Sequence, residues 1–298
     1  MKLYLGTHMP SWLSRPLGVP LLVSHRRLAG RRSLPRAANS WALDSGGFTE
    51  LDLHGRWQIG EKKYVRAVRR YVDEIGKLDW VAPQDWMCEP YILQRTGLTV
   101  REHQRRTIRN FIRLRELAPE IPIVPVLQGW NISDYQRCFD LYGQAGIDLE
   151  SEPLVGIGTV CRRQHSVDVE QIVRTFASQN LRVHAFGVKT TGLRRYAEAL
   201  SSSDSAAWSL RGRHVPGCTP SHQTESNCLR FALSWHRRIR VAIQQDTGPG
   251  EQSTRPDSSR NRLTPVIMAS PGLARRYLPR PIQSISSRHA PTVGRRAA

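Results

Sequence analysis

Short apolar runs recur along the first 200 residues and alternate with longer amphipathic segments. The runs are KLYLG, PLLVS, SWALDS, LDWVAP, PIVPVLQG, LVGIGTV and RVHAFGV, each of a length typical of one buried strand. Apolar residues at helical spacing occur between several of them, in residues 62–78, 100–118, 132–146 and 168–180. Strands that alternate with helices of this length indicate βαβ units and a parallel sheet. The pattern predicts an α/β fold, and its seven or eight repeats favour a (β/α)8 TIM-like barrel over an open sheet.

The rhythm changes after residue 200, where cysteines and histidines accumulate. We expect a barrel over residues 1–243 that includes a small metal-binding insertion at about 212–240. Residues 244–298 are rich in Ser, Pro, Arg and Gly and have almost no apolar periodicity. Such a composition predicts a disordered basic tail.

Length and composition limit the class of protein to which this chain can belong. The 298 residues are enough for one large domain or two ordinary ones, and 39% of them are hydrophobic. No apolar run reaches eighteen residues, which excludes a membrane span, and the start MKLYLGTHMPSW lacks a signal-peptide core. We therefore expect a cytoplasmic protein. Its five cysteines are an odd number in a chain of this size, which favours thiols or metal ligands over disulfides.

The chain carries a formal net charge of +19. A protein this basic attracts polyanions, and nucleic acid is the first candidate. Arginine greatly outnumbers lysine and is spread through the chain, so a solvated basic surface is the simpler interpretation. We favour contact with nucleic acid.

The stretch WALDSGGFTEL joins a carboxylate to a flexible turn. Asp44 and Ser45 follow the apolar Trp41-Ala42-Leu43, at the end of a strand where parallel α/β folds hold their active sites. Gly46 and Gly47 indicate a tight turn or a surface against which a flat molecule lies. A plain turn, with Asp44 capping the next helix, explains the same residues.

Polar residues and glycines lie at or after the ends of most of the apolar runs, including the one just described, and a further Asp lies in the segment after the last run. They are Asp44, Ser45, Gly46, Gly47 and Phe48; then Asp85; Gln128 and Gly129; Gly156 and Gly158; Gly187 and Lys189; and Asp204 in SSSDSAAWS. Because parallel strands bring their carboxyl ends to one edge, we expect these groups to share one rim.

This ordered series resembles the tRNA-guanine transglycosylase superfamily over about residues 1–240. The enzymes of that superfamily carry an Asp-Ser-Gly-Gly-Phe motif, a later Asp, a Gln-Gly pair, a Gly-rich strand end, a nucleophilic Asp and a zinc subdomain, in this order. The segments YLGTHMPSWL and SSSDSAAWS are more similar to the deazapurine DNA modification branch, whose members insert a 7-deazaguanine into DNA. The residues that usually surround the nucleophile of the tRNA enzymes are absent. DNA is therefore favoured over tRNA.

The resemblance implies a base exchange by two carboxylates. Asp204 would attack C1′ of a deoxyguanosine and form a covalent glycosyl-enzyme intermediate. Asp44 would protonate the departing guanine and deprotonate the incoming 7-deazaguanine. In a duplex the target nucleotide must first be extruded. ATPase or helicase partner subunits are a further expectation.

The other residues of the series would bind the base. Asp85 would accept hydrogen bonds from N1–H and the exocyclic amine of guanine, and Gln128 and the Gly158 backbone would donate to O6. Glycines 46, 47 and 156 would let the flat base approach the backbone. Phe48 would pack beneath the base, and Ser45 and Gly129 complete the expected substrate-binding set.

A second cluster combines thiols with imidazole. Cys218, His222 and Cys228 have the spacing C-x3-H-x5-C, and a structural zinc site needs four such ligands. The candidates for the fourth ligand are Glu225, His214 and His236, and Glu225 lies in the loop where the resemblance leads us to expect a further cysteine. We predict a structural Zn²⁺; the alternative is an unmetallated loop. Cys88, Cys138 and Cys161 are interpreted as packing residues.

Two other functions fit parts of this pattern. One is guanine exchange in tRNA, by the same chemistry. The other is a barrel that binds nucleic acid without catalysis. A binding protein has no need for both Asp44 and Asp204, so this pair favours an enzyme.

Overall fold

The computed structural model of the chain describes residues 1–246, which belong to one compact unit. The expected basic tail begins inside the last helix, α10 (Leu229–Asp246), and residues 247–298 lie outside the described residues. None of the described helices is long and apolar enough to cross a membrane.

Eight parallel strands form one sheet, in the order β4-β3-β2-β1-β8-β7-β6-β5. They are β1 (Lys2–Thr7), β2 (Leu21–Ser24), β3 (Trp41–Asp44), β4 (Leu78–Val81), β5 (Val126–Leu127), β6 (Val155–Ile157), β7 (Val183–Ala185) and β8 (Ser202–Ser205). The predicted α/β fold of the TIM-barrel type is confirmed, and each apolar run of the sequence contains one of the first seven strands.

The two edge strands are joined through the chain that precedes β5. Val81 of β4 donates its N–H to Pro122 O at 2.9 Å and accepts from Val124 N–H at 3.1 Å. A parallel bridge between Val81 and Ile123 lies at the same place. These contacts bring the β4 edge to the β5 side of the sheet, so that the sheet curls into a barrel.

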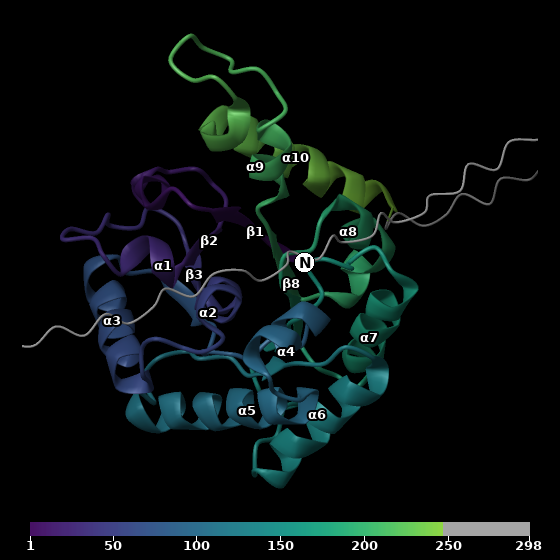
Figure 1. Cartoon of the computed structure of the whole chain (residues 1–298). Coiled ribbons are helices and arrows are strands. Elements are labelled where there is room, and N and C mark those ends of the chain that lie inside the picture. The colour runs from purple at the N-terminus through teal and green to yellow at the C-terminus, as the bar shows by residue number, and fades with distance from the viewer. Residues whose placement is uncertain (247–298) are drawn as a thin grey trace, which may run out of the picture. The chain divides into compact units, whose positions relative to one another are not determined.

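Helices accompany the strands. They are α1 (His25–Leu28), α2 (Gly47–His54), α3 (Glu61–Glu74), α4 (Pro90–Thr96), α5 (Val100–Leu117), α6 (Ile132–Gln144), α7 (Val167–Ser178), α8 (Thr190–Tyr196), α9 (Ala207–Gly212) and α10. Most of them form an outer ring, and α2 and α4 lie inside this ring in the view of Figure 1. The four amphipathic segments of the sequence form α3, α5, α6 and α7, which bury their apolar faces against the sheet. Thr99, Asn131 and Ser166 cap the last three of these helices, because each side chain accepts a hydrogen bond from an N–H of the first turn.

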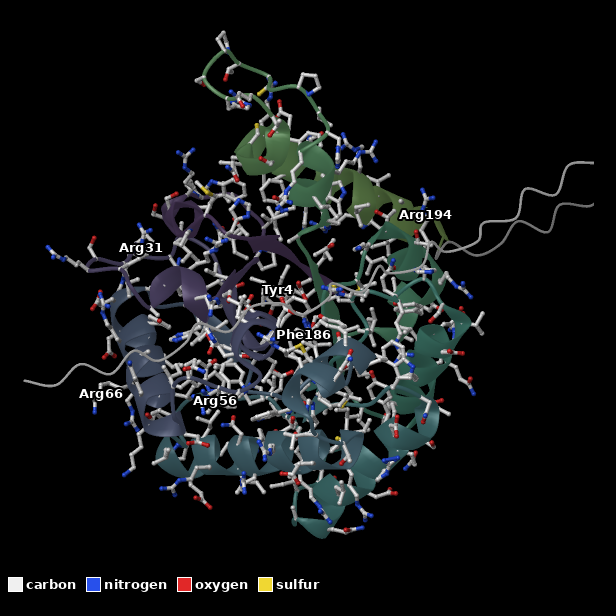
Figure 2. All side chains as sticks on the ribbon, in the orientation of Figure 1. Tyr4, Arg31, Arg56, Arg66, Phe186 and Arg194 are labelled. Carbon is white, nitrogen blue, oxygen red and sulfur yellow. The ribbon has the colours of Figure 1, made fainter. Side chains whose placement is uncertain are left out.

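The interior of the barrel is aromatic. Tyr4, Leu22, Trp80 and Val124 belong to one buried cluster, against which Phe186 packs. Figure 2 shows Tyr4 and Phe186 near the centre of the ring of helices, whereas Arg31, Arg66 and Arg194 lie at its periphery. Because side chains fill the interior, a ligand of the barrel belongs at the strand ends.

Candidate active site

A cavity of about 340 Å³ opens at the carboxyl ends of the strands. Its volume is in the range of small-molecule sites. Seven of the eight strands contribute a residue at or just after their end: Thr7, Ser24, Asp44, Asp85, Gly158, Gly187 and Asp204. The predicted common rim is confirmed for Asp44, Asp85 and Asp204.

Asp44 is the last residue of β3 and lies beside Ser24, its partner in the β2–β3 register. Burial raises the pKa of Asp44, while hydrogen bonds from the Ser24 side chain and the Gly46 backbone lower it in part. The negative charge of Asp204 raises this pKa further. A carboxyl group with a raised pKa can carry a proton closer to neutral pH, as a general acid must.

Asp204 lies in β8 and is 6% exposed. Its Oδ1 accepts a hydrogen bond of 2.8 Å from the backbone N–H of Gly187, which follows β7. The β1–β8 register pairs Asp204 with Tyr4 in the barrel interior. The carboxylate is therefore held at the floor of the cavity.

Asp85 lines the cavity and belongs to a hydrogen-bond network with Gln128 and Ser45, which are buried and do not line the cavity. It accepts from Gln128 Nε2 at 2.6 Å and from Ser45 Oγ at 3.3 Å. Thr159 Oγ1 donates to Gln128 Oε1 at 2.5 Å and fixes the orientation of the amide. Burial, followed by the charge of Asp44, raises the pKa of Asp85 to about 7, against the opposing effect of these hydrogen bonds.

The structure explains why two of the predicted glycines carry no side chain. Gly46 has φ +84° at the N-cap of α2, a conformation that favours glycine, and the Arg26 side chain packs against it. Gly158 lines the cavity, and a Cβ there would lie 2.3 Å from Gln128 Nε2. The absence of a side chain at Gly158 thus keeps the Gln128 amide in place.

Three of the expected contacts with the base have other partners in this structure. The Gly158 N–H donates to Leu127 O at 3.0 Å within the sheet, so the expected donation to O6 is wrong for this N–H. Gly156 faces the Phe186 ring, where a Cβ would lie 2.7 Å from Cε2, and does not line the cavity. Gly129 packs against Tyr135 of α6, also away from the cavity.

Aromatic and basic side chains gather beside Phe48. Phe48 lines the cavity and lies 6.1 Å from Tyr91, measured between ring centroids. The exposed Arg162 stands 4.8 Å from the centroid of each ring. Gly47 also lines the cavity, and a Cβ there would lie 3.2 Å from Asp85 Oδ1. A base that entered the cavity would pass this cationic and aromatic group.

Sequence reasoning missed several cavity residues. Glu89 and Thr159 line the cavity, and burial raises the pKa of Glu89. Cys161 is exposed and lines the cavity, so its interpretation as a packing residue is wrong, whereas Cys88 and Cys138 are buried as expected. A buried His184 lies close to Asp204, and its place in an apolar strand was the signal that could have identified it.

The cysteine and histidine cluster lies apart, between α9 and α10. Ligand atoms of Cys218, His222, Glu225 and Cys228 all lie within 4.8 Å of one another, and this group could hold a metal ion. Glu225 is thus the candidate that joins the cluster. His214 is exposed and outside it, and His236 lies 3.0 Å from the carbonyl oxygen of Leu3.

The distances fit a tetrahedral ion. Cys218 Sγ lies 3.6 Å from Cys228 Sγ and 3.4 Å from His222 Nε2, and His222 Nε2 lies 3.6 Å from Glu225 Oε1. Two thiolates on a tetrahedral zinc are roughly 3.8 Å apart, given a zinc–sulfur distance of about 2.3 Å. The second oxygen of Glu225 is buried without a hydrogen-bond partner among the described residues. A cation would satisfy it.

Comparison with known proteins identifies one family. The family model of DpdA, described as DeoxyPurine in DNA protein A, matches residues 1–260. No curated protein matches the chain significantly. Among solved structures, thiamine phosphate pyrophosphorylase from Pyrococcus furiosus is similar with a TM-score of 0.35 and 10% identity, over 83% of this chain and 97% of that chain.

Proposed function

Because the chain belongs to the DpdA (DeoxyPurine in DNA protein A) family, we propose that it exchanges guanine in DNA for a 7-deazaguanine through a covalent intermediate on Asp204. Family membership supports a transglycosylase of deazapurine DNA modification in general. The choice of reacting residues and of the incoming base is our proposal.

The observation that carries this proposal is the pair Asp44 and Asp204 in one cavity. The two carboxylates have different surroundings: the Gly187 N–H bonds to Asp204, whereas burial and the neighbouring charge raise the pKa of Asp44. Such a difference separates the roles of nucleophile and proton donor in enzymes that use two carboxylates. A barrel that only bound nucleic acid would gain nothing from it.

The exchange proceeds in two displacements at C1′. The Asp204 carboxylate forms a bond to C1′ of the target deoxyguanosine as the bond from C1′ to N9 breaks, and Asp44 gives its proton to the departing guanine. The incoming 7-deazaguanine then loses its N9 proton to Asp44. Its N9 bonds to C1′, and the Asp204 carboxylate is released. The configuration at C1′ is retained, as in retaining glycosidases.

The network around Asp85 would recognise both bases. Ionised Asp85 accepts from N1–H and the exocyclic amine, groups that guanine and 7-deazaguanine share. Gln128 gives one amide hydrogen to Asp85, is buried and does not line the cavity, so its part would be to hold the Asp85 carboxylate in place for the base. Gly47 and Phe48 border the same cavity and would contact the faces of the base.

Duplex DNA poses a problem of access, because the target must leave the base stack at a cost of about a few kcal/mol. The basic surface of the chain offsets part of this through phosphate contacts. ATPase or helicase partner subunits would supply strand opening. We also assign a structural zinc to Cys218, His222, Glu225 and Cys228, where it would hold the loop between α9 and α10.

Labelled guanine offered with duplex DNA tests the proposal. Asp204→Asn should abolish both exchange and the covalent adduct, because an amide attacks poorly. Asp44→Asn should retain some residual activity, since proton transfer typically contributes about 10²–10⁴-fold to the rate. Asp140→Asn, which removes an exposed carboxylate of α6, is the control.

Near-normal exchange by Asp204→Asn would eliminate the mechanism. The same assay with tRNA decides the substrate. Incorporation into tRNA and none into DNA would replace the DNA assignment by guanine exchange in tRNA.

A further inference from the structure

His184 is a polar ring in an aromatic environment. It lies in β7 and is 0% exposed. Its ring centroid lies 4.6 Å from that of Trp80, 4.6 Å from that of Phe186 and 6.1 Å from that of Tyr4. An apolar side chain would fill such a space without burying polar nitrogens, so the imidazole calls for a chemical reason.

The two ring nitrogens face two residues of the neighbouring strand β8. The β7–β8 register pairs His184 with Ser202, and Nδ1 lies 2.8 Å from Ser202 Oγ. Nε2 lies 3.4 Å from Asp204 Oδ1 and has no hydrogen-bond partner among the described residues. Hydrogen bonds of catalytic groups are often long before substrate binds and tighten in the complex.

We propose that His184 is a positioning residue for the nucleophile: its Nε2–H and the Gly187 N–H hold Oδ1 of Asp204, which leaves Oδ2 to attack C1′. This inference rests on the proposed function of Asp204. This role of His184 requires the Ser202 hydroxyl, which lies 2.8 Å from Nδ1, to donate to that nitrogen, since the ring proton is then on Nε2.

Both steps of the exchange use the same arrangement. While Asp204 is an anion, two N–H groups at one oxygen restrict the carboxylate to one orientation. When Oδ2 is bonded to C1′, Oδ1 becomes the carbonyl oxygen of the ester and still accepts both hydrogen bonds. His184 therefore keeps Asp204 in position for the incoming base to displace it, without giving up or taking a proton.

Two amide substitutions separate the contacts of the ring. In His184→Asn the side-chain nitrogen reaches about as far as Nδ1, so only the Ser202 contact survives. In His184→Gln it reaches about as far as Nε2, so a donor to Asp204 remains. Adduct formation in a single turnover should slow by on the order of 10–100-fold in His184→Asn and by only about 2–5-fold in His184→Gln, with DNA dissociation constants unchanged in both.

Equal slowing in the two variants, or a normal rate in His184→Asn, would overturn the positioning role. If both variants unfold, nitrogen NMR spectra of the His184 ring in the wild-type protein still decide: a proton on Nε2 supports the proposal, and a proton on Nδ1 overturns it. Asp204→Asn in the same assay tests the proposed function separately. Loss of adduct in Asp204→Asn beside a normal rate in His184→Asn would remove the role of His184 alone.

Discussion

Asp85 makes the stability of the fold depend on pH, and Asp85→Asn should remove that dependence. The substitution keeps the size of the side chain. An amide can accept from Gln128 Nε2 and donate to Ser45 Oγ, which replaces both contacts of the carboxylate. The change therefore removes the ionisation of Asp85 and preserves the network.

The magnitude follows from the pKa of Asp85, which burial and the charge of Asp44 raise from 3.8 to about 7. Each pKa unit between the folded and unfolded states corresponds to about 1.4 kcal/mol. With a discount for solvent at the cavity mouth, the full rise corresponds to about 2–4 kcal/mol. Below pH 3.8 both states are protonated. Above pH 3.8 Asp85 ionises in the unfolded chain but stays protonated in the folded state. The free energy of unfolding therefore falls as pH rises, until Asp85 of the folded state ionises near pH 7.

Urea unfolding between pH 4 and 8, followed by the fluorescence of the eight tryptophans, measures this effect. The free energy of unfolding of the wild type should fall with pH relative to that of Asp85→Asn, by about 2–4 kcal/mol in total. Asp140→Asn controls for the loss of one carboxylate at an exposed site. Parallel curves for wild type and Asp85→Asn, or a wild type that gains stability relative to the variant as pH rises, would refute the reasoning.

Three further predictions concern the metal, the base and the DNA. Metal analysis of the purified wild type should find about one zinc per chain, and of Cys228→Ser less than half a zinc per chain. Less than half a zinc per chain in well-folded wild type would contradict the site. Gly158→Ala should raise the KM for the incoming base on the order of tenfold, because its methyl group displaces Gln128; an unchanged KM would exclude that role. The affinity of wild type for DNA should fall with rising salt, and Arg162→Ala should make the plot of log K against log salt less steep by about 0.9; Arg66→Ala on α3 is its control. Equal slopes for wild type and Arg162→Ala would place Arg162 outside the DNA contact.

The rim of the site was predictable because its chemistry follows strand ends. An apolar run as short as Trp41-Ala42-Leu43 identifies a strand, and the first polar residue after the run, Asp44, then lies at the carboxyl edge. Asp44 reaches the cavity for this reason, and Asp85 follows the β4 run by one further residue, whereas Asp204 lies within the polar strand β8, which has no apolar run. For Asp44 the position along the chain was sufficient, without knowledge of its neighbours.

Contacts between strands were not predictable, since they depend on register. The Gly158 N–H is taken by Leu127, and the space beside Gly156 is filled by Phe186, which directly follows β7. His184 lies next to Ser202 only because β7 and β8 pair in one register. In the metal cluster, the spacing left three candidates open, and the fold of the loop brings in Glu225 alone.

The pairing of β1 with β8 ties the two ends of the barrel together. Tyr4 lies opposite Asp204, and Trp208 Nε1 donates to Gly6 O at 2.8 Å. On the ribosome, β1 emerges first and must wait for roughly 200 further residues, a delay of roughly 10–40 s at about 5–20 residues per second. The proposed nucleophile is thus placed by the same step that closes the barrel. A nascent or prematurely terminated chain has neither the closed barrel nor the placed Asp204, so the proposed cleavage of a glycosidic bond in DNA becomes possible only once the barrel is complete.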